Sequence, residues 1–123
     1  MKFLIDTNFL LIPGKFGVDV FREMERFGKP ELFTISLVKD ELMALASGRG
    51  QDASHARLGL GLIEKKGIRV LESAGNNADS ELERLSSEQG FAVCTQDREL
   101  QERLRKKGVS VVSLRQKRRL EKS

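Results

Sequence analysis

Two aspartates stand where apolar runs of the sequence end. The run at 3–5 leads into Asp6, and the run at 91–94 leads through Thr95 and Gln96 into Asp97. Short apolar runs bounded by polar residues are typical of buried strands in a parallel sheet. Ligands of open α/β sheets bind just beyond the carboxyl ends of the strands. The sequence therefore predicts two carboxylates at one sheet edge, which is the beginning of a metal site.

Helical spacing adds further carboxylates to this edge. On a helix after Ser36, a rotation of about 100° per residue puts Asp40 opposite the apolar stripe and Glu41 beside it. A carboxylate bordering the buried face is costly unless it is paired or binds a cation. In a later helix, Asp79 and Glu81 lie on the two borders of the stripe. Asp79 is preferred because it lies in the first turn, and Glu81 stays as an alternative.

Four acids that converge without a compensating His, Cys or buried Lys repel one another, and a divalent cation removes that repulsion. Oxygen ligands suit Mg²⁺ or Mn²⁺ and not structural zinc. One such ion polarises a phosphoryl oxygen and activates water, and a pair also stabilises the leaving oxygen. The pattern indicates one or two Mg²⁺ or Mn²⁺ ions and the chemistry of phosphodiester hydrolysis.

Each acid also has a structural alternative. Asp97 could cap a helix, since Asp is favoured there, and Asp79 could favour a helix N-terminus through the macrodipole. Glu41 could pair with a Lys or Arg, and Asp6 could form an Asx-type turn. For Asn8, the structural alternative is that it does no more than cap the first helix. All of these alternatives occurring together at one edge is a weaker explanation than a shared site.

Five strand-like runs must position these residues, and helical patterns alternate with them. Such alternation predicts an α/β domain with a mostly parallel sheet and helices on both faces. Ser36 is a candidate cap for the second helix, and Gly59 and Gly61 in the third indicate close packing against the sheet or a dimer partner. The runs are Lys2–Asp6, Glu31–Ser36, Ile68–Glu72, Phe91–Thr95 and Ser110–Leu114.

Size and composition set the class of protein. The 123 residues suit one domain, and 39% hydrophobic with 33% charged residues indicate a globular chain with a heavily charged surface. No apolar stretch approaches the roughly 20 residues that span a bilayer, and no signal-peptide pattern precedes the first strand. We therefore expect a cytoplasmic protein with no membrane partner. Its one cysteine, Cys94, is expected to be a small buried hydrophobe.

The net charge of +4 is uneven along the chain. Residues 115–123 are expected to form a basic C-terminal tail that suits a polyanionic partner such as RNA. The alternative is a solvated terminus. The cations expected to contact RNA are Arg115, Lys117, Arg118 and Arg119.

In order and spacing, the motifs resemble the PIN-domain family of metal-dependent ribonucleases. The resemblance covers nearly the whole chain, roughly Lys2 to Leu114. It implies a three-layer α/β/α domain over residues 1–114 and a twisted, mostly parallel five-stranded sheet. The matching pieces are Phe3–Asn8, Glu41, Asn77–Asp79 and Cys94–Asp97.

The resemblance also implies roles. Asn8 and Thr95 would support the site through hydrogen bonds, and RNA would be cut endonucleolytically by metal-activated water. The metal ligands and catalytic residues would be Asp6, Glu41, Asp79 and Asp97.

Within the family, the run from Thr95 to Leu104 looks like the branch that processes ribosomal RNA precursors. The toxin–antitoxin branch shares the same acids, so a ribosome precursor and an antitoxin are both candidate partners. A homodimer is a further expectation. One departure is Ser80, where the processing branch often has a second Asp, and Glu81 could compensate for it.

Two other functions compete with the enzyme. The runner-up is a PIN-like module that binds RNA or protein without cutting, although such a module would be expected to lose one of the acids. A phosphoacceptor signalling domain, with Asp6 as the acceptor, is the weaker hypothesis. Such a domain usually needs an acidic pair before the acceptor and a late Lys at a strand end, and neither is evident in the sequence.

Overall fold

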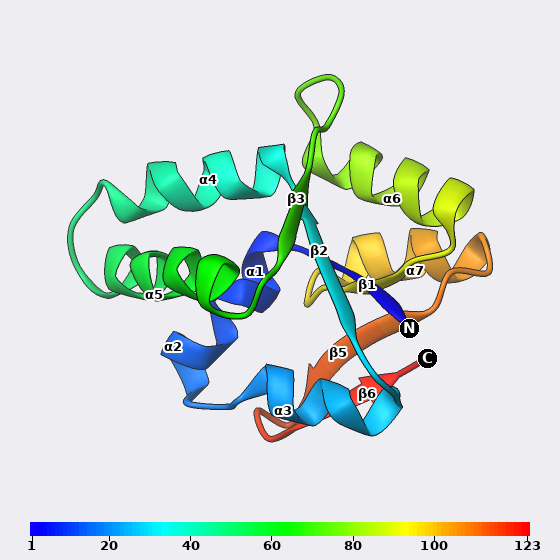
Figure 1. Ribbon diagram of the computed structural model, residues 1–123, viewed down its shortest axis with the longest axis horizontal. Coiled ribbons are helices and arrows are strands. Elements are labelled where there is room, and N and C mark those ends of the chain that lie inside the picture. The colour runs from blue at the N-terminus through cyan, green and yellow to red at the C-terminus, as the bar shows by residue number, and fades with distance from the viewer.

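The computed structural model describes residues 1–123 as a three-layer α/β/α domain built on one six-stranded sheet, which confirms the predicted fold class (Figure 1). The strand order is β3-β2-β1-β4-β5-β6. The first five strands are parallel, and β6 runs antiparallel to β5. The strands are β1 (Lys2–Ile5), β2 (Glu31–Ile35), β3 (Arg69–Leu71), β4 (Ala92–Cys94), β5 (Val111–Arg115) and β6 (Arg119–Lys122).

Helices cover both faces of the sheet. α4 and α5 pack together with α1 and α2 on one face, and α6 and α7 pack on the other against β4 and β5 (Figure 1). The helices are α1 (Thr7–Leu10), α2 (Ile12–Phe16), α3 (Val20–Met24), α4 (Ser36–Ala46), α5 (Gln51–Lys65), α6 (Ala78–Gln89) and α7 (Arg98–Lys106), with a 3₁₀ turn at Glu25–Phe27. None of them is long and apolar enough to cross a membrane.

The central strand explains why the acids meet. Phe3, Leu4 and Ile5 are completely buried because β1 has a strand on each side and helices on both faces. Ile5 pairs with Cys94 of β4, and the ladder continues one bond further, from the Asp6 N–H to the Cys94 carbonyl at 3.0 Å. The carboxyl ends of β1 and β4 are therefore level, so the loops that carry Asp6 and Asp97 begin side by side.

The prediction of five strands and a free basic tail is wrong, because residues 119–122 form a sixth strand. Arg115 pairs with Arg119, and Leu114 pairs with Leu120. Leu120 is fully buried while its strand neighbours are exposed. A short, charged edge strand of this kind resists edge-to-edge association. The last residues are thus part of the domain, and their cations are held on a hairpin.

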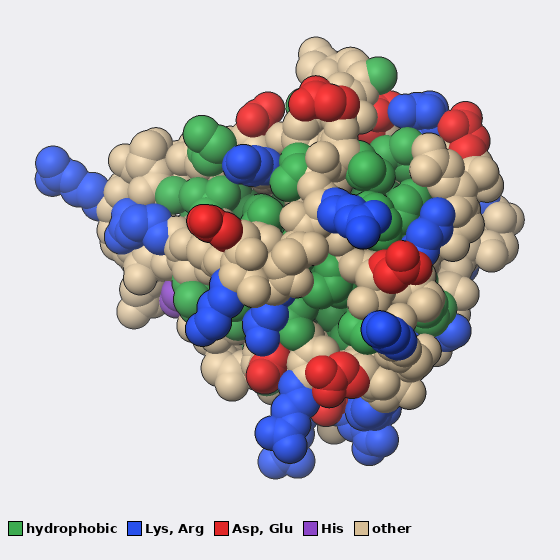
Figure 2. Space-filling view, viewed as in Figure 1, with side chains coloured by type: hydrophobic (Ala, Val, Ile, Leu, Met, Phe, Trp, Pro, Cys, Tyr) green, Lys and Arg blue, Asp and Glu red, His purple; other side chains and the backbone are tan.

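The two helical glycines have different surroundings. A Cβ on Gly59 would lie 3.1 Å from the Leu10 carbonyl oxygen, so α5 closely approaches α1 and not the sheet, which was one of the two explanations that the sequence left open. A Cβ on Gly61 would meet nothing within 4 Å. Gly59 therefore has a packing reason inside the chain. On the face of the molecule shown in Figure 2, acidic and basic side chains are scattered among apolar ones.

Candidate metal and active site

The acids chosen from the sequence line one cavity at the carboxyl edge of the sheet. Its volume is about 190 Å³. Asp6 follows β1, Glu41 comes from α4, Asp79 from the start of α6, and Asp97 from the start of α7. The complete lining is Asp6, Thr7, Asn8, Leu11, Glu41, Leu45, Ala78, Asp79 and Asp97.

Asp6 is the buried centre of this cavity, with 5% of its surface exposed. Its Oδ1 accepts the Thr7 N–H at 2.7 Å, and its Oδ2 accepts the Thr95 hydroxyl at 2.8 Å and the Asn8 amide at 3.3 Å. Burial raises the pKa of Asp6 to about 6, against these hydrogen bonds, which lower it. The Asp79 and Glu41 carboxylates raise it further, so the cavity concentrates negative charge.

Asn8 and Thr95 join the loops that follow β1 and β4. The Gln96 N–H donates to Asn8 Oδ1 at 2.9 Å, and the Asp97 N–H donates to Thr95 Oγ1 at 3.1 Å. Because Thr95 also donates to Asp6, one hydroxyl links both aspartate-bearing loops. This is the arrangement expected of side chains that orient ligands without ligating.

Asp97 is also the helix cap that the sequence allowed as its alternative role. Its Oδ1 accepts the Glu99 N–H at 3.0 Å and the Leu100 N–H at 3.2 Å, where α7 begins. Both capping bonds go to Oδ1. Oδ2 is left for the cavity, so capping and ligation are compatible on this side chain.

Glu41 is more exposed than its helical position indicated, and it has no cation partner. Its Oε2 accepts the Thr7 hydroxyl at 3.1 Å, which ties α4 to the start of α1. No Lys or Arg forms an ion pair with it. The alternative in which Glu41 serves a surface ion pair is therefore wrong. Thr7 was not singled out in the sequence as a supporting residue, although it lies between Asp6 and Asn8.

Asp79 is half-buried in the first turn of α6, next to the Asn77 side chain that caps this helix at the Ser80 N–H. Burial raises the pKa of Asp79, and repulsion by Asp97 adds to it, while Arg103 acts in the opposite direction. Arg103 lies on α7 and forms an ion pair with Glu83 of α6. Its positive charge lowers the pKa of Asp79, and helix spacing alone could not reveal this contact between α7 and α6.

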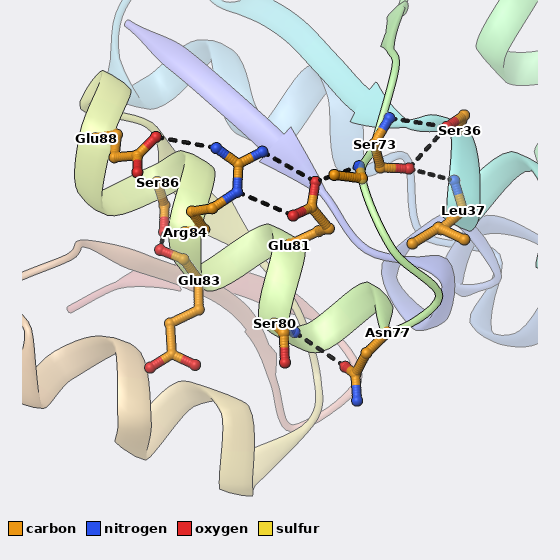
Figure 3. Close-up of polar contacts among 11 residues, drawn as sticks. Ser36, Leu37, Ser73, Asn77, Ser80, Glu81, Glu83, Arg84, Ser86 and Glu88 are labelled. Carbon is orange, nitrogen blue, oxygen red and sulfur yellow. Dashed lines mark hydrogen bonds and ion pairs between the residues drawn. The ribbon is translucent and has the colours of Figure 1, made fainter.

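The sequence-based expectation that Glu81 supports the acid site is not what the structure shows. Glu81 is buried, but its Oε2 accepts the Ala74 N–H at 2.8 Å, and its oxygens pair with Arg84 at 2.9 and 3.1 Å (Figure 3). Arg84 lowers the pKa of Glu81. Both oxygens are thus engaged in holding the loop between β3 and α6, and Glu81 does not line the cavity.

The same loop is joined to the start of α4. The Ser36 and Ser73 hydroxyls are 2.7 Å apart (Figure 3). The Ser36 hydroxyl accepts the Ser73 backbone N–H, and the Ser73 hydroxyl accepts the Leu37 backbone N–H. Ser36 is therefore not the helix cap that was predicted. These bonds join the first turn of α4, the helix that carries Glu41, to the loop that leads into α6, the helix that carries Asp79.

The donor set of the cavity fits a hard divalent cation. Carboxylate oxygens, the Asn8 amide and hydroxyls line it, with no His or Cys. The pKa of Asp6 is raised partly by other carboxylates, so a positive charge among them would relieve repulsion. As the side chains stand, no three of them are close enough to hold one ion together.

Comparison with known proteins identifies the same family that the sequence motifs resemble. A family model described as a PIN like domain matches residues 3–117. Ribonuclease VapC4 of Methanocaldococcus jannaschii is 30% identical over 124 residues, 98% of this chain and 95% of that protein. Ribonuclease VapC9 of Archaeoglobus fulgidus is 30% identical over 118 residues, 95% of this chain and 85% of that protein.

A solved structure supports the fold independently. The structure of the PIN domain endonuclease Utp24 superposes with a TM-score of 0.81 at 23% identity, covering 98% of this chain and 90% of that one. The similarity of fold therefore extends over nearly the whole chain.

Proposed function

Because this chain belongs to the PIN-like domain family, we propose that it is a divalent-metal-dependent endoribonuclease. The observation that carries the proposal is the cavity that the buried Asp6 lines together with three other carboxylates, those of Glu41, Asp79 and Asp97. The relatives named as ribonucleases align with almost the full length of the chain. We place the enzyme in the cytosol, where the only cysteine, buried Cys94, stays a free thiol.

The residues that would hold one or two Mg²⁺ or Mn²⁺ ions are Asp6, Glu41, Asp79 and Asp97. When bound, such an ion polarises a phosphoryl oxygen and lowers the pKa of water. Asp6 needs no movement for this role, because three hydrogen bonds already orient it. Thr95 and Asn8 keep the Asp6 and Asp97 loops in register, and the Asp97 cap leaves Oδ2 for the ion.

Two biological roles are compatible with the proposed activity. The resemblance around Thr95–Leu104 favours processing of ribosomal RNA precursors, with a ribosome precursor as the partner. The second candidate is a toxin-type ribonuclease with an antitoxin partner, favoured because both curated relatives carry VapC names. Expression in a host without the gene's neighbours separates them. A toxin arrests growth and is rescued by an adjacent small gene, whereas a processing enzyme leaves growth unchanged.

The activity itself is tested with purified protein, Mn²⁺ and a mixed RNA pool. We expect cleavage by the wild type, and loss of at least 100-fold in rate for Asp6→Asn, in line with removal of a central group at an active site. Asp40→Asn is the matched control, since Asp40 is an exposed carboxylate on the same helix as Glu41. Binding of RNA without cleavage by the wild type would favour the binding-module alternative. Equal cleavage by Asp6→Asn would identify a contaminating nuclease.

A further inference from the structure

A second and larger cavity adjoins the acid cavity. Its volume is about 730 Å³, and it lies between α7 and the last three residues of β5. Gln96 lines this second cavity, while its neighbour Asp97 lines the first, so the two cavities share one loop. The lining is Gln96, Arg98, Gln101, Glu102, Arg105, Ser113, Leu114, Arg115 and Gln116. We call it the arginine groove.

The charge of the arginine groove is opposite to that of the acid cavity. It contains three arginines and one glutamate. Arg98 is exposed and has no ion pair or side-chain hydrogen bond within the chain. Arg105 donates only its Nε, to the Ser123 hydroxyl at 2.9 Å, and Arg115 makes one exposed ion pair with Glu121 at 3.3 Å. Most of the guanidinium donors are therefore free to meet an anion.

The neutral lining indicates what kind of anion fits. Only Leu114 is hydrophobic, and no aromatic ring lines the groove on which a base could stack. Gln96 is fixed as part of the wall, because its amide both donates to the Leu114 carbonyl at 3.2 Å and accepts the Leu114 N–H at 2.6 Å. Such a surface recognises phosphate and sugar and carries little information about base identity.

The rim of the groove is a turn whose backbone conformation is unfavourable for non-glycine residues. Gln116 and Lys117 have φ values of 54° and 56°, in the left-handed region that glycine adopts without strain. Gln116 lines the groove. Positive φ values are what tight β-hairpin turns require, and this turn joins β5 to β6 with Arg115 and Gln116 in the lining of the groove.

We propose that the arginine groove holds the RNA strand on one side of the bond that is cut. The inference rests on the proposed ribonuclease function and extends it to the path of the substrate. Phosphates contact Arg98, Arg105 and Arg115, while the scissile phosphate lies over the acid cavity beyond Gln96 and Asp97. Because the contacts are to the backbone, binding on this flank is independent of base sequence.

The test compares Arg98→Ala/Arg115→Ala with the control Lys29→Ala/Lys65→Ala. The control removes the same charge from exposed residues that precede β2 and β3, at the opposite edge of the sheet. Binding of labelled oligouridine and oligoadenosine is measured in EDTA, so that cleavage does not intervene. We expect roughly 10-fold weaker binding of both oligomers by the groove variant, and a salt slope lower by about 1.4 for the two lost phosphate contacts.

Cleavage in Mn²⁺ provides the second readout. The groove variant should raise KM roughly 10-fold while kcat changes less than about 2-fold, because the lost contacts are made equally in the ground and transition states. If the wild type cleaves RNA and the groove variant matches the Lys29 and Lys65 control in slope and KM, the groove assignment is wrong and the ribonuclease stands. Unequal losses for the two oligomers would refute a backbone-only contact. If the wild type binds RNA through the groove but does not cleave it, the ribonuclease proposal is wrong and the groove assignment stands.

Discussion

Asp6→Asn should stabilise the metal-free protein at neutral pH, even though it removes the central residue of the proposed site. Burial raises the pKa of Asp6 from 3.8 to about 6. In the unfolded chain the carboxyl loses its proton near its ordinary pKa, whereas the folded protein retains it until about pH 6. The folded protein therefore loses stability as the pH rises from about 4 to about 6, and does not regain it above.

The size of the effect follows from the pKa and the hydrogen bonds. A shift of roughly 2 pKa units on a carboxyl that is only 5% exposed corresponds to about 3 kcal/mol at pH 7. Asn keeps an oxygen for the Thr7 N–H but puts an amide where the Thr95 hydroxyl donates, at a cost of about 1 kcal/mol. We expect Asp6→Asn to be about 2 kcal/mol more stable than wild type at pH 7.5, and about 1 kcal/mol less stable at pH 4.

Urea unfolding in EDTA at a series of pH values measures this difference. Far-ultraviolet circular dichroism is the suitable signal, because the chain has no Trp or Tyr for fluorescence. Asp40→Asn, which changes an exposed carboxylate, should show no change of sign across the series. A difference between Asp6→Asn and wild type that stays constant with pH would refute the reasoning, because the penalty would then not come from the charge.

Metal should reverse the order of stability. A ligand that binds only the folded state stabilises by about 2.7 kcal/mol at 100 times its Kd. Wild type in Mn²⁺ should gain more than Asp6→Asn, so that the variant's advantage at pH 7.5 disappears. Equal gains by the two proteins would place the ion away from Asp6.

Three further predictions concern stability at residues outside the acid cavity. Gln116→Gly should raise the free energy of unfolding by about 1 kcal/mol in urea melts, since glycine tolerates the positive φ; a loss would show that the side chain supports the turn. Gly59→Ala should cost about 1–3 kcal/mol, because its Cβ would meet the Leu10 carbonyl at 3.1 Å, whereas Gly61→Ala faces open space and should gain up to about 1 kcal/mol; equal effects would contradict the packing argument. Glu81→Gln should lower stability by about 1 kcal/mol and increase hydrogen exchange in the loop between β3 and α6, with unchanged exchange as the contrary result.

The parts of the fold that could be predicted are those governed by local pattern. A central parallel strand is buried on both faces, so β1 is a continuous apolar run and the residue after it, Asp6, is at the edge where ligands bind. Helix periodicity likewise selected Glu41 and Asp79, since a residue's face depends only on its neighbours in sequence. Both side chains line the predicted cavity.

Residues whose roles depend on distant partners were not predictable in this way. Ser36 looked like a cap, but its hydroxyl bonds Ser73, 37 positions away. Glu81 lies on the face that periodicity indicated, yet periodicity says nothing about the Ala74 N–H that it accepts. β6 was missed because Leu120 is its only buried residue, and an exposed, charged edge strand has the composition of a loop.

The loop from Thr95 to Asp97 connects the two proposed halves of the site. Thr95 donates to Asp6 and accepts from the Asp97 N–H, while Gln96 bonds the backbone of Leu114 beside the arginine groove. Moving this loop would therefore displace Asp97 and the groove wall together and break the hydrogen bond from Thr95 that orients Asp6. An enzyme that positions metal ligands and the substrate backbone independently would need two rigid supports. Here one loop of three residues, fixed between the ends of β4 and β5, sets the distance between the chemistry and the strand on which it acts.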